Sequence, residues 1–229
     1  MSFEGVVFQR DVKQALLELA LPCNDQQLAK LEQFSNGFFK WNSIHNLSAI
    51  THYEDYLGVH LMDSLAVIAP LLQKVRLGLL PEDANMADLG TGGGFPGVLL
   101  AIFLPKMTFY LVDSIRKKTA FLEHIKGRLQ LKNIHVIEQR IELFAKDYPL
   151  QMDATISRAF SELKHFVAYS KPLLKPNGLL FAMKSQKTDQ ELVDVQEDCM
   201  VLANEELKIP HLDAYRCLLT LQFMRKSQG

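Results

Sequence analysis

The stretch DLGTGGGFPG, residues 88–97, follows a short apolar run and is dense in glycine. Glycine tolerates left-handed backbone conformations and lets the main chain approach a ligand closely, so this loop predicts a contact made by backbone groups. A dinucleotide-binding fingerprint would need glycine where Phe95 stands. A Walker loop would need lysine followed by Ser or Thr, and residues 87–104 contain no lysine. The stretch therefore predicts a ligand other than a dinucleotide or a nucleoside triphosphate.

Around this loop, short β-like runs alternate with helical runs. We predict strands at 85–89, 107–113, 134–139, 153–158 and 178–184, and helices at 97–104, 114–130, 161–174 and 188–203. This order requires right-handed crossovers and predicts an α/β fold with a parallel sheet. The last two runs, 207–212 and 214–224, are separated by a short link and predict a closing antiparallel hairpin.

Before residue 80 the pattern is helical. Apolar residues recur at spacings of three and four over 11–20, 25–44 and 55–72, which predicts three amphipathic helices. Asn24 or Asp25 is a suitable N-cap for the second helix, and Pro70 is expected to bend or end the third. We therefore divide the chain into an N-terminal helical extension, 1–78, and an α/β domain, 79–229.

Composition limits the partners. The chain has 229 residues, 48% of them hydrophobic, and 25 Lys+Arg against 26 Asp+Glu give a formal charge of −1. This balance provides no global attraction to nucleic acid or membrane, so RNA binding would need a local basic patch. Cys23, Cys199 and Cys217 are far apart, which argues against disulfides and structural zinc and favours a reducing cytoplasm. Cys199 is expected in a helix. No secretory leader or membrane span is predicted, and no metal site.

Read as acid-x-Gly-x-Gly-x-Gly, the loop resembles the S-adenosylmethionine-binding loop of class I methyltransferases. In this interpretation Asp88 accepts hydrogen bonds from an ammonium group, while Gly90, Gly92 and Gly94 let the chain pass close to the ligand. Asp113 ends the next strand, where an acid can bind both ribose hydroxyls, or can equally cap the following helix.

The remaining strand ends carry further candidates. Ile141 and Glu142 follow the third strand and could meet an adenine ring, although Arg140 and Glu142 could instead form a solvated salt pair. Arg158 ends the fourth strand between apolar runs, and because a buried arginine needs a partner, we expect it to reach into the ligand crevice. Lys184 ends the fifth strand in a similar setting.

Upstream, a polar cluster lies within the third predicted helix. His60, Asp63 and Ser64 are spaced i, i+3 and i+4, which places them on one face of an α-helix. They either fix this helix to the sheet through hydrogen bonds or, for His60 and Asp63, lie at the mouth of the site. Asn42 and Asn46 have the same two interpretations.

Taken together, DLGTGGGFPG, LVDSIRKKTAFLEHI, QRIE, ISRAF and AMKS, preceded by KWNSIHNLSAI and HLMDSL, resemble the bacterial 16S ribosomal RNA guanine-N7 methyltransferase family, also called glucose-inhibited division protein B. The resemblance runs from about Trp41 to the C-terminal segment. It implies a class I, Rossmann-like fold with a seven-stranded, mostly parallel sheet. Ser185, where the family usually has glycine, and residues 43–45, which often include lysine, depart from the pattern.

The resemblance also implies the site and the reaction. S-adenosylmethionine would contact Gly90, Phe95, Ile141, Glu142 and Arg158, with Asp88, Gly92, Gly94 and Asp113 supporting the same site. The methyl group would go to guanine N7 in the 530 loop of 16S rRNA, leaving S-adenosylhomocysteine. The substrate would be naked RNA, the small subunit or an assembly intermediate, with no obligatory protein partner.

The chemistry agrees with what the chain lacks. No Pro-Pro pair, typical of amino-group methylation, occurs. Attack on a pyrimidine would need a cysteine nucleophile near the cofactor, and we interpret all three cysteines, in the helical region, a predicted helix and a late strand, as structural. Guanine N7 is an acceptor without a proton, so no general base is required. Candidates for the target site are Arg158, Lys184, His60 and Asp63, and candidates for RNA binding are Arg116, Lys117, Lys118 and Arg128. A small-molecule methyltransferase and a non-catalytic RNA-binding or ribosome-assembly module remain the alternatives.

Overall fold

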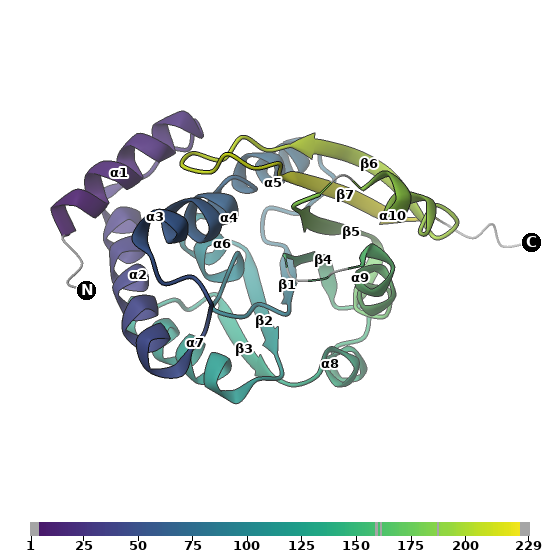
Figure 1. Cartoon of the computed structure of the whole chain (residues 1–229). Helices are drawn as coiled ribbons and strands as arrows, with labels where there is room; N and C mark the ends of the chain where they lie inside the picture. The colour runs from purple at the N-terminus through teal and green to yellow at the C-terminus, as the bar shows by residue number, and fades with distance from the viewer. Residues whose placement is uncertain (1–4, 159, 161, 187, 225–229) are drawn as a thin grey trace, which may run out of the picture.

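In the part of the chain that the structure describes, seven strands form one mixed sheet in the order β3-β2-β1-β4-β5-β7-β6 (Figure 1). The computed structural model describes residues 5–158, 160, 162–186 and 188–224. The strands are β1 Asn85–Leu89, β2 Thr108–Asp113, β3 Ile134–Glu138, β4 Met152–Ser157, β5 Leu174–Lys184, β6 Cys199–Glu206 and β7 Cys217–Phe223. Strands β1 to β5 pair in parallel, and β7 runs antiparallel to both β5 and β6. The predicted parallel sheet with an antiparallel hairpin is confirmed.

Helices cover both faces of the sheet. The connecting helices are α6 Gly97–Phe103, α7 Arg116–Leu129, α8 Ile141–Asp147, α9 Leu163–Ser170 and α10 Asp189–Val193. Helices α6 and α7 lie on the face that also carries the N-terminal helices, and α8 and α9 lie on the other (Figure 1). Each face has its own hydrophobic core, as expected for a parallel sheet buried on both sides. The order of the strands reverses between β1 and β4, and ligands of such sheets bind at this point.

The N-terminal segment is helical, as predicted, and packs onto the sheet domain. Its elements are α1 Gly5–Glu18, α2 Asp25–His45, α3 Tyr53–Asp55, η1 Tyr56–Met62, α4 Asp63–Leu65 and α5 Ile68–Arg76. Asn24 is the N-cap of α2 and forms a capping box with Gln27. Phe38 of α2 contacts the rings of Phe95 and Phe121, so the N-terminal helices share a core with α6 and α7.

The third predicted helix, 55–72, is not one continuous α-helix. Residues 56–62 form a π-helix, and the helix is interrupted again at Ala66 and Val67 before α5 begins. Pro70 falls in the first turn of α5, where its missing N–H costs no hydrogen bond. The stretch Tyr53–Arg76 is long and apolar enough to cross a membrane, but 72% of its most apolar 18 residues is buried inside the protein, as in the core helix of a folded domain.

Two predictions near the C-terminus are wrong. The predicted helix 188–203 contains only the short α10 before β6 begins, so Cys199 lies in a strand. The predicted strand 207–212 is part of the link between β6 and β7. Pro210 in that link has no N–H to donate to a neighbouring strand. Residues 199–206 form a strand because they pair with β7, although their local preference for strand is weak.

Candidate functional site

The glycine-rich turn between β1 and α6 is tied to the end of β2. The backbone N–H groups of Gly90 and Thr91 donate to the carbonyl of Val112 at 2.9 and 3.1 Å, and that of Gly92 donates to Asp113 Oδ2 at 3.0 Å. Gly90 and Gly92 have φ of +74° and +59°. A side chain at either position would strain the backbone, which is why the turn needs glycine there.

Gly94 has a packing role that the sequence did not indicate. Its φ is +89°, and a Cβ atom there would lie 2.6 Å from Val98 Cγ2 and 2.9 Å from Leu122 Cδ2. A Cβ on Gly92, in contrast, would meet nothing closer than 3.9 Å. Gly92 therefore borders open space, whereas the absence of a side chain at Gly94 lets α6 and α7 pack closely against the turn. The predicted ligand contact of Gly94 stays a prediction.

Asp88 lies beneath this turn and is 1% exposed. Its Oδ2 accepts a hydrogen bond of 2.9 Å from the Gly97 N–H at the start of α6, so it does anchor a helix. Among the described residues, Asp88 Oδ1 and the Thr91 hydroxyl are buried without a hydrogen-bond partner. Burial raises the pKa of Asp88 to about 6, although the nearby Thr91 hydroxyl and the Gly97 N–H oppose the rise.

Beyond the turn, a cavity of about 430 Å³ opens at the ends of β2 and β3. It is lined by Gly90, Val112, Asp113, Ser114, Gln139, Arg140, Ile141, Glu142, Phe160 and Tyr169. Asp113 lines this cavity and also accepts hydrogen bonds from the N–H groups of Gly92 and Ile115, so it both organises the loops and faces the cavity. Glu142 accepts a hydrogen bond from the Tyr169 hydroxyl at 3.0 Å. A hydrogen bond from its own backbone N–H, and then this contact with Tyr169, lower the pKa of Glu142.

A second, larger cavity of about 790 Å³ lies at the ends of β4 and β5. It is lined by Val59, His60, Asp63, Arg158, Phe160, Met183, Lys184, Ser185, Gln186, Gln190, Glu191, Leu207, Arg216 and Cys217. Phe160 lines both cavities, so they meet at its side chain. Two strand ends and the helical segment 56–65 thus bring together all four predicted target-site residues, Arg158, Lys184, His60 and Asp63.

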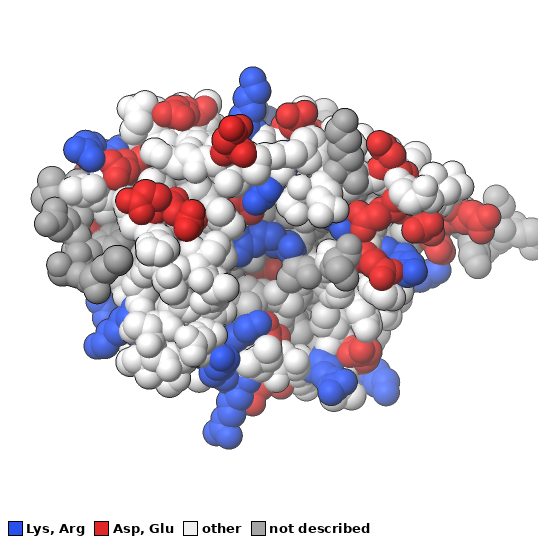
Figure 2. Space-filling model, in the orientation of Figure 1, with Lys and Arg blue, Asp and Glu red and all other residues white. Residues whose placement is uncertain are grey.

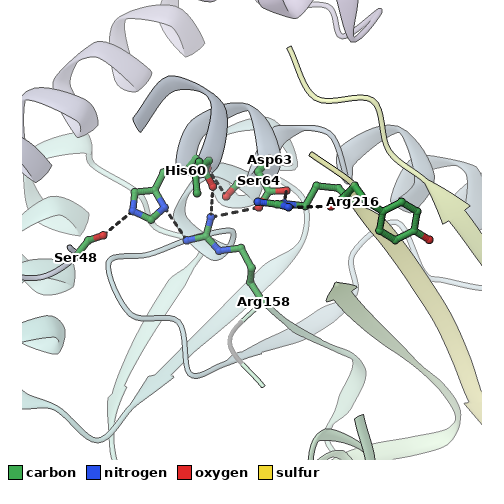
Figure 3. A network of polar contacts seen from close by, with 8 residues as sticks. Ser48, His60, Asp63, Ser64, Arg158 and Arg216 are labelled. Carbon is green, nitrogen blue, oxygen red and sulfur yellow. Dashed lines mark hydrogen bonds and ion pairs between the residues drawn. The ribbon is translucent and has the colours of Figure 1, made fainter. Parts of the chain in front are cut away.

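Arg158 is the centre of a polar network between the sheet and the π-helix (Figure 3). Its Nη1 donates to the carbonyl of Val59 at 2.9 Å and lies 3.5 Å from Asp63 Oδ2, and its Nη2 lies 3.0 Å from His60 Nδ1. The guanidinium also lies over the Phe95 ring, 5.2 Å from its centroid. The partners of this arginine are therefore protein groups, and its side chain also lines the larger cavity, while the predicted contact of Arg158 with a ligand stays a prediction.

His60 is neutral in this network. Because arginine only donates, Nδ1 of His60 must accept from Arg158, which leaves the proton on Nε2 facing Ser48 Oγ at 2.8 Å. Burial, and then the charge of Arg158, lower the pKa of His60 to about 3. The ring stacks on Phe95 with centroids 4.6 Å apart. His60 thus positions other groups and does not exchange protons near neutral pH.

Asp63 is shared between two arginines. Arg216 Nε lies 3.2 Å from Asp63 Oδ1, opposite the Arg158 contact. Ser64, although it is next in the sequence, donates to the carbonyl of His60 and does not join the site. Because residues 56–62 form a π-helix, the α-helical spacing assumed for His60, Asp63 and Ser64 is wrong. His60 and Asp63 tie the segment to the sheet and line the larger cavity, and their place in the target site stays a prediction.

The two asparagines have structural roles. Asn42 donates to the carbonyl of Ile50 and accepts from the N–H of Ser48, which braces the loop that carries Ser48 to His60. Asn46 ends α2 in the left-handed conformation, with φ of +49°. Neither lines the larger cavity.

The basic residues of α7 divide into two pairs. Lys117 Nζ donates to the carbonyls of His45 and Asn46, and Lys118 Nζ lies 3.4 Å from Asp113 Oδ2, so both stabilise neighbouring loops. Arg116 and Arg128 are exposed. The predicted contacts of all four with RNA stay predictions.

Several lining residues were missed from the sequence. They include Phe160, Tyr169, Glu191 and Arg216. Arg216 directly precedes β7, and a correct start for that strand would have placed it at the sheet edge near Lys184, the partner of Cys217 in the ladder. Glu191 fell inside the overlong predicted helix.

The model of one protein family, rRNA small subunit methyltransferase G, matches residues 27–219. The chain belongs to this family. A ribosomal RNA small subunit methyltransferase G from Polynucleobacter asymbioticus is 45% identical over 91% of this chain and 93% of its own length. One from Bordetella avium is 38% identical over 99% and 97%.

Solved structures of more distant proteins share this fold. The structure of TrmN from Thermus thermophilus matches with a TM-score of 0.51 at 15% identity, over 67% of this chain and 48% of that one. The fibrillarin/Nop5p complex matches with a TM-score of 0.52 at 15% identity, over 63% and 75%. The family and fold are those of S-adenosylmethionine-dependent methyltransferases.

The residues present suit this cofactor. Asp88 and the Thr91 hydroxyl are buried side by side beneath the turn, neither Asp88 Oδ1 nor the hydroxyl makes a well-formed hydrogen bond among the described residues, and Gly92 presents backbone to open space. The carboxylate of Asp113 and the apolar side chain of Ile141 line the neighbouring cavity. These groups match an ammonium, a ribose and an adenine in the order that the family resemblance predicts.

Proposed function

We propose that this chain transfers the methyl group of S-adenosylmethionine to N7 of a guanine in the 530 loop of 16S rRNA. One observation carries the proposal: a cavity at the ends of β2 and β3 and a larger one at the ends of β4 and β5 meet at Phe160, beside the point where the strand order reverses. The first suits the cofactor and the second suits a base. The named relatives act on small-subunit rRNA, which supports the substrate class.

Cofactor binding is assigned to the smaller cavity and the glycine turn. Asp113 would accept the ribose hydroxyls, Ile141 and Glu142 would border the adenine, and Asp88 with Gly90 and Gly92 would hold the methionine portion. When bound, S-adenosylmethionine supplies an electrophilic methyl group. Phe95 and Arg158 support this site from the side, since Arg158 lies over the Phe95 ring and also lines the larger cavity.

The protein's contribution to the reaction is positioning. Guanine N7 carries a lone pair and no proton, so no residue must act as a general base. Neutral His60, paired Asp63 and the Arg158 guanidinium form a rigid wall of the target cavity, and a rigid wall favours one orientation of the base. To enter such a pocket the base must leave its stack.

RNA would approach the face that carries these cavities. Figure 2 shows Lys and Arg side chains in the central hollow of this face and along its lower rim, with acidic side chains gathered toward the upper and right-hand rims. Exposed Arg116 and Arg128 are available for phosphates, whereas Lys117 and Lys118 would first have to leave their loop contacts. We further propose that residues 1–78 form an extension of a methyltransferase domain, 79–229, that the substrate is naked 16S rRNA, the small subunit or an assembly intermediate, and that the enzyme works in the cytoplasm.

Mapping of N7-methylguanine tests the assignment. Ribosomal RNA from cells with and without this chain should differ at one guanine in the 530 loop, and the purified protein should restore the methyl group with S-adenosylmethionine. An unchanged map would refute the target, and methylation of a metabolite with no reaction on RNA would identify a small-molecule enzyme. Absence of S-adenosylmethionine binding in calorimetry would leave a non-catalytic RNA-binding protein.

A further inference from the structure

The larger cavity contains a second charged pair, separate from the Arg158 network. Lys184 Nζ, at the end of β5, lies 2.8 Å from Glu191 Oε1 on α10 and also donates to the carbonyl of Phe160 at 3.5 Å. The N–H of Leu163, at the start of α9, donates to the same Glu191 oxygen at 3.0 Å. Both contacts hold Oε1, so the carboxylate is fixed in orientation by two different elements and lines the cavity together with the ammonium.

The other carboxylate in this cavity, Asp63, is less suited to meet a ligand. Its side chain is 4% exposed, and its two oxygens face Arg158 and Arg216. The side chain of Glu191 is 26% exposed and that of Lys184 is 10% exposed. Glu191 is therefore the acid in the cavity that a ligand reaches most easily, and it stands directly beside a cation.

An adjacent cation and carboxylate match one edge of guanine. The Watson–Crick edge of guanine presents the O6 acceptor next to the N1–H and N2–H₂ donors, whereas adenine presents a donor at N6 next to an acceptor at N1. The ammonium of lysine only donates, and a carboxylate only accepts. Guanine thus satisfies both groups, whereas adenine would place a donor against the ammonium and an acceptor against the carboxylate.

We propose that Lys184 and Glu191 are the specificity residues that read the target base, Lys184 at O6 and Glu191 at N1–H and the 2-amino group. This inference rests on the proposed function, since it assumes that guanine enters the larger cavity. N7 lies on the opposite side of O6 from N1, so a base held at its Watson–Crick edge by Lys184 and Glu191 leaves N7 free to face away from them. Phe160, which lines both cavities, offers an aromatic surface for contact with the base.

The test replaces guanosine by inosine at the methylated position. Inosine keeps O6, N1–H and N7 and lacks only the 2-amino group. Synthetic 16S rRNA with either nucleoside is assayed both naked and reconstituted into small subunits, with the wild type, Glu191→Gln, Glu191→Ala and the exposed control Asp194→Asn. The quantity compared is the ratio of kcat/KM on guanosine to that on inosine, and S-adenosylmethionine binding is measured for each variant.

The expected ratio is graded. A hydrogen bond to a charged acceptor predicts a guanosine preference of about 10- to 100-fold in the wild type and in Asp194→Asn. A neutral acceptor in Glu191→Gln predicts about 2- to 10-fold, and Glu191→Ala predicts a ratio near one. Because both kcat/KM values in a ratio are measured with the same preparation of one variant, partial unfolding of that preparation does not change the ratio. Cofactor affinity should stay within about twofold of the wild type in all variants.

Three results would overturn the inference. If the wild type methylates inosine as well as guanosine, no carboxylate reads the 2-amino group. If the wild type discriminates and both Glu191 variants keep the full ratio, another residue is the reader. If the wild type methylates neither RNA in either form, the proposed function itself is refuted, which is a different outcome from active enzymes with unchanged ratios.

Discussion

Substitution of Asp88 by Asn should make the protein more stable and its cofactor binding weaker. Asp88 is 1% exposed, and burial raises its pKa from the ordinary 3.8 to about 6. Between these two values the folded state holds the proton more tightly than the unfolded state, so the charged form costs stability above pH 6 and the cost disappears as the pH falls through the window. A shift of about two pH units corresponds to about 3 kcal/mol.

The asparagine keeps an oxygen for the Gly97 N–H and removes the charge. At pH 7.5 we therefore expect the free energy of unfolding of Asp88→Asn to exceed that of the wild type by up to about 3 kcal/mol, and the difference to shrink toward zero near pH 4. Urea unfolding at several pH values from 4 to 8 measures this, with the exposed Asp83→Asn as the control that should show no such trend.

Cofactor binding should move in the opposite direction. Loss of a charged acceptor for an ammonium group predicts S-adenosylmethionine binding that is weaker by about 10- to 100-fold in calorimetry. Such a trade of stability for binding is common at functional sites. Equal stability of the two proteins, or a difference that stays constant from pH 4 to 8, would refute the argument that the buried charge is costly, and unchanged affinity would remove Asp88 from the cofactor site.

Three further predictions concern the turn and the network. Gly92→Ala should cost about 1–2 kcal/mol of backbone strain and weaken cofactor binding. Gly94→Ala should lower the melting temperature further, because the added methyl group overpacks the contact with α6 and α7 by about 1–3 kcal/mol. Equal losses of stability in the two variants would contradict the packing role of Gly94. The ring of His60, with its pKa lowered to about 3, should show no NMR titration between pH 5 and 8. Because the unfolded chain takes up a proton on His60 below pH 6.5 and the folded protein does not, the free energy of unfolding should fall by up to about 1.4 kcal/mol for each pH unit below 6.5. A titration midpoint near 6.5 would disprove the neutral tautomer. Arg158→Lys cannot hold a carbonyl, a carboxylate and an imidazole at once, so it should destabilise the protein by about 1–3 kcal/mol and slow methyl transfer at least tenfold. The control Arg76→Lys, at an exposed position of α5, should retain wild-type kinetics and stability. Wild-type behaviour of Arg158→Lys would count against the network.

Local pattern was sufficient for the parallel part of the sheet and the glycine turn. Strands β1 to β4 are short apolar runs between strong helical patterns, and the turn needs glycine because Gly90 and Gly92 take left-handed backbone conformations. The acid at the end of β2 was found for the same reason, since strand ends can be read from composition. These signals lie within a few residues of one another.

The C-terminal hairpin and the π-helix depended on distant contacts. β6 has a mixed pattern and becomes a strand by pairing with β7, more than ten residues later, so local propensity misassigned it to a helix. The π-helix accommodates one wider turn in a segment whose α-helical spacing looked regular. Neither the pairing partner nor the widened turn leaves a mark in the sequence of the segment itself.

The sequence by itself determined the fold class, the turn and the strand-end residues, because backbone conformation and hydrophobic periodicity are local properties. Only the tertiary structure decided how these residues are used. Asp88 anchors a helix with one oxygen, and its other oxygen has no hydrogen-bond partner among the described residues. Arg158 follows β4 and Arg216 precedes β7, yet both contact the carboxylate of Asp63. Charged groups in a low-dielectric interior must find partners wherever the fold brings them, and those partners can lie anywhere along the chain.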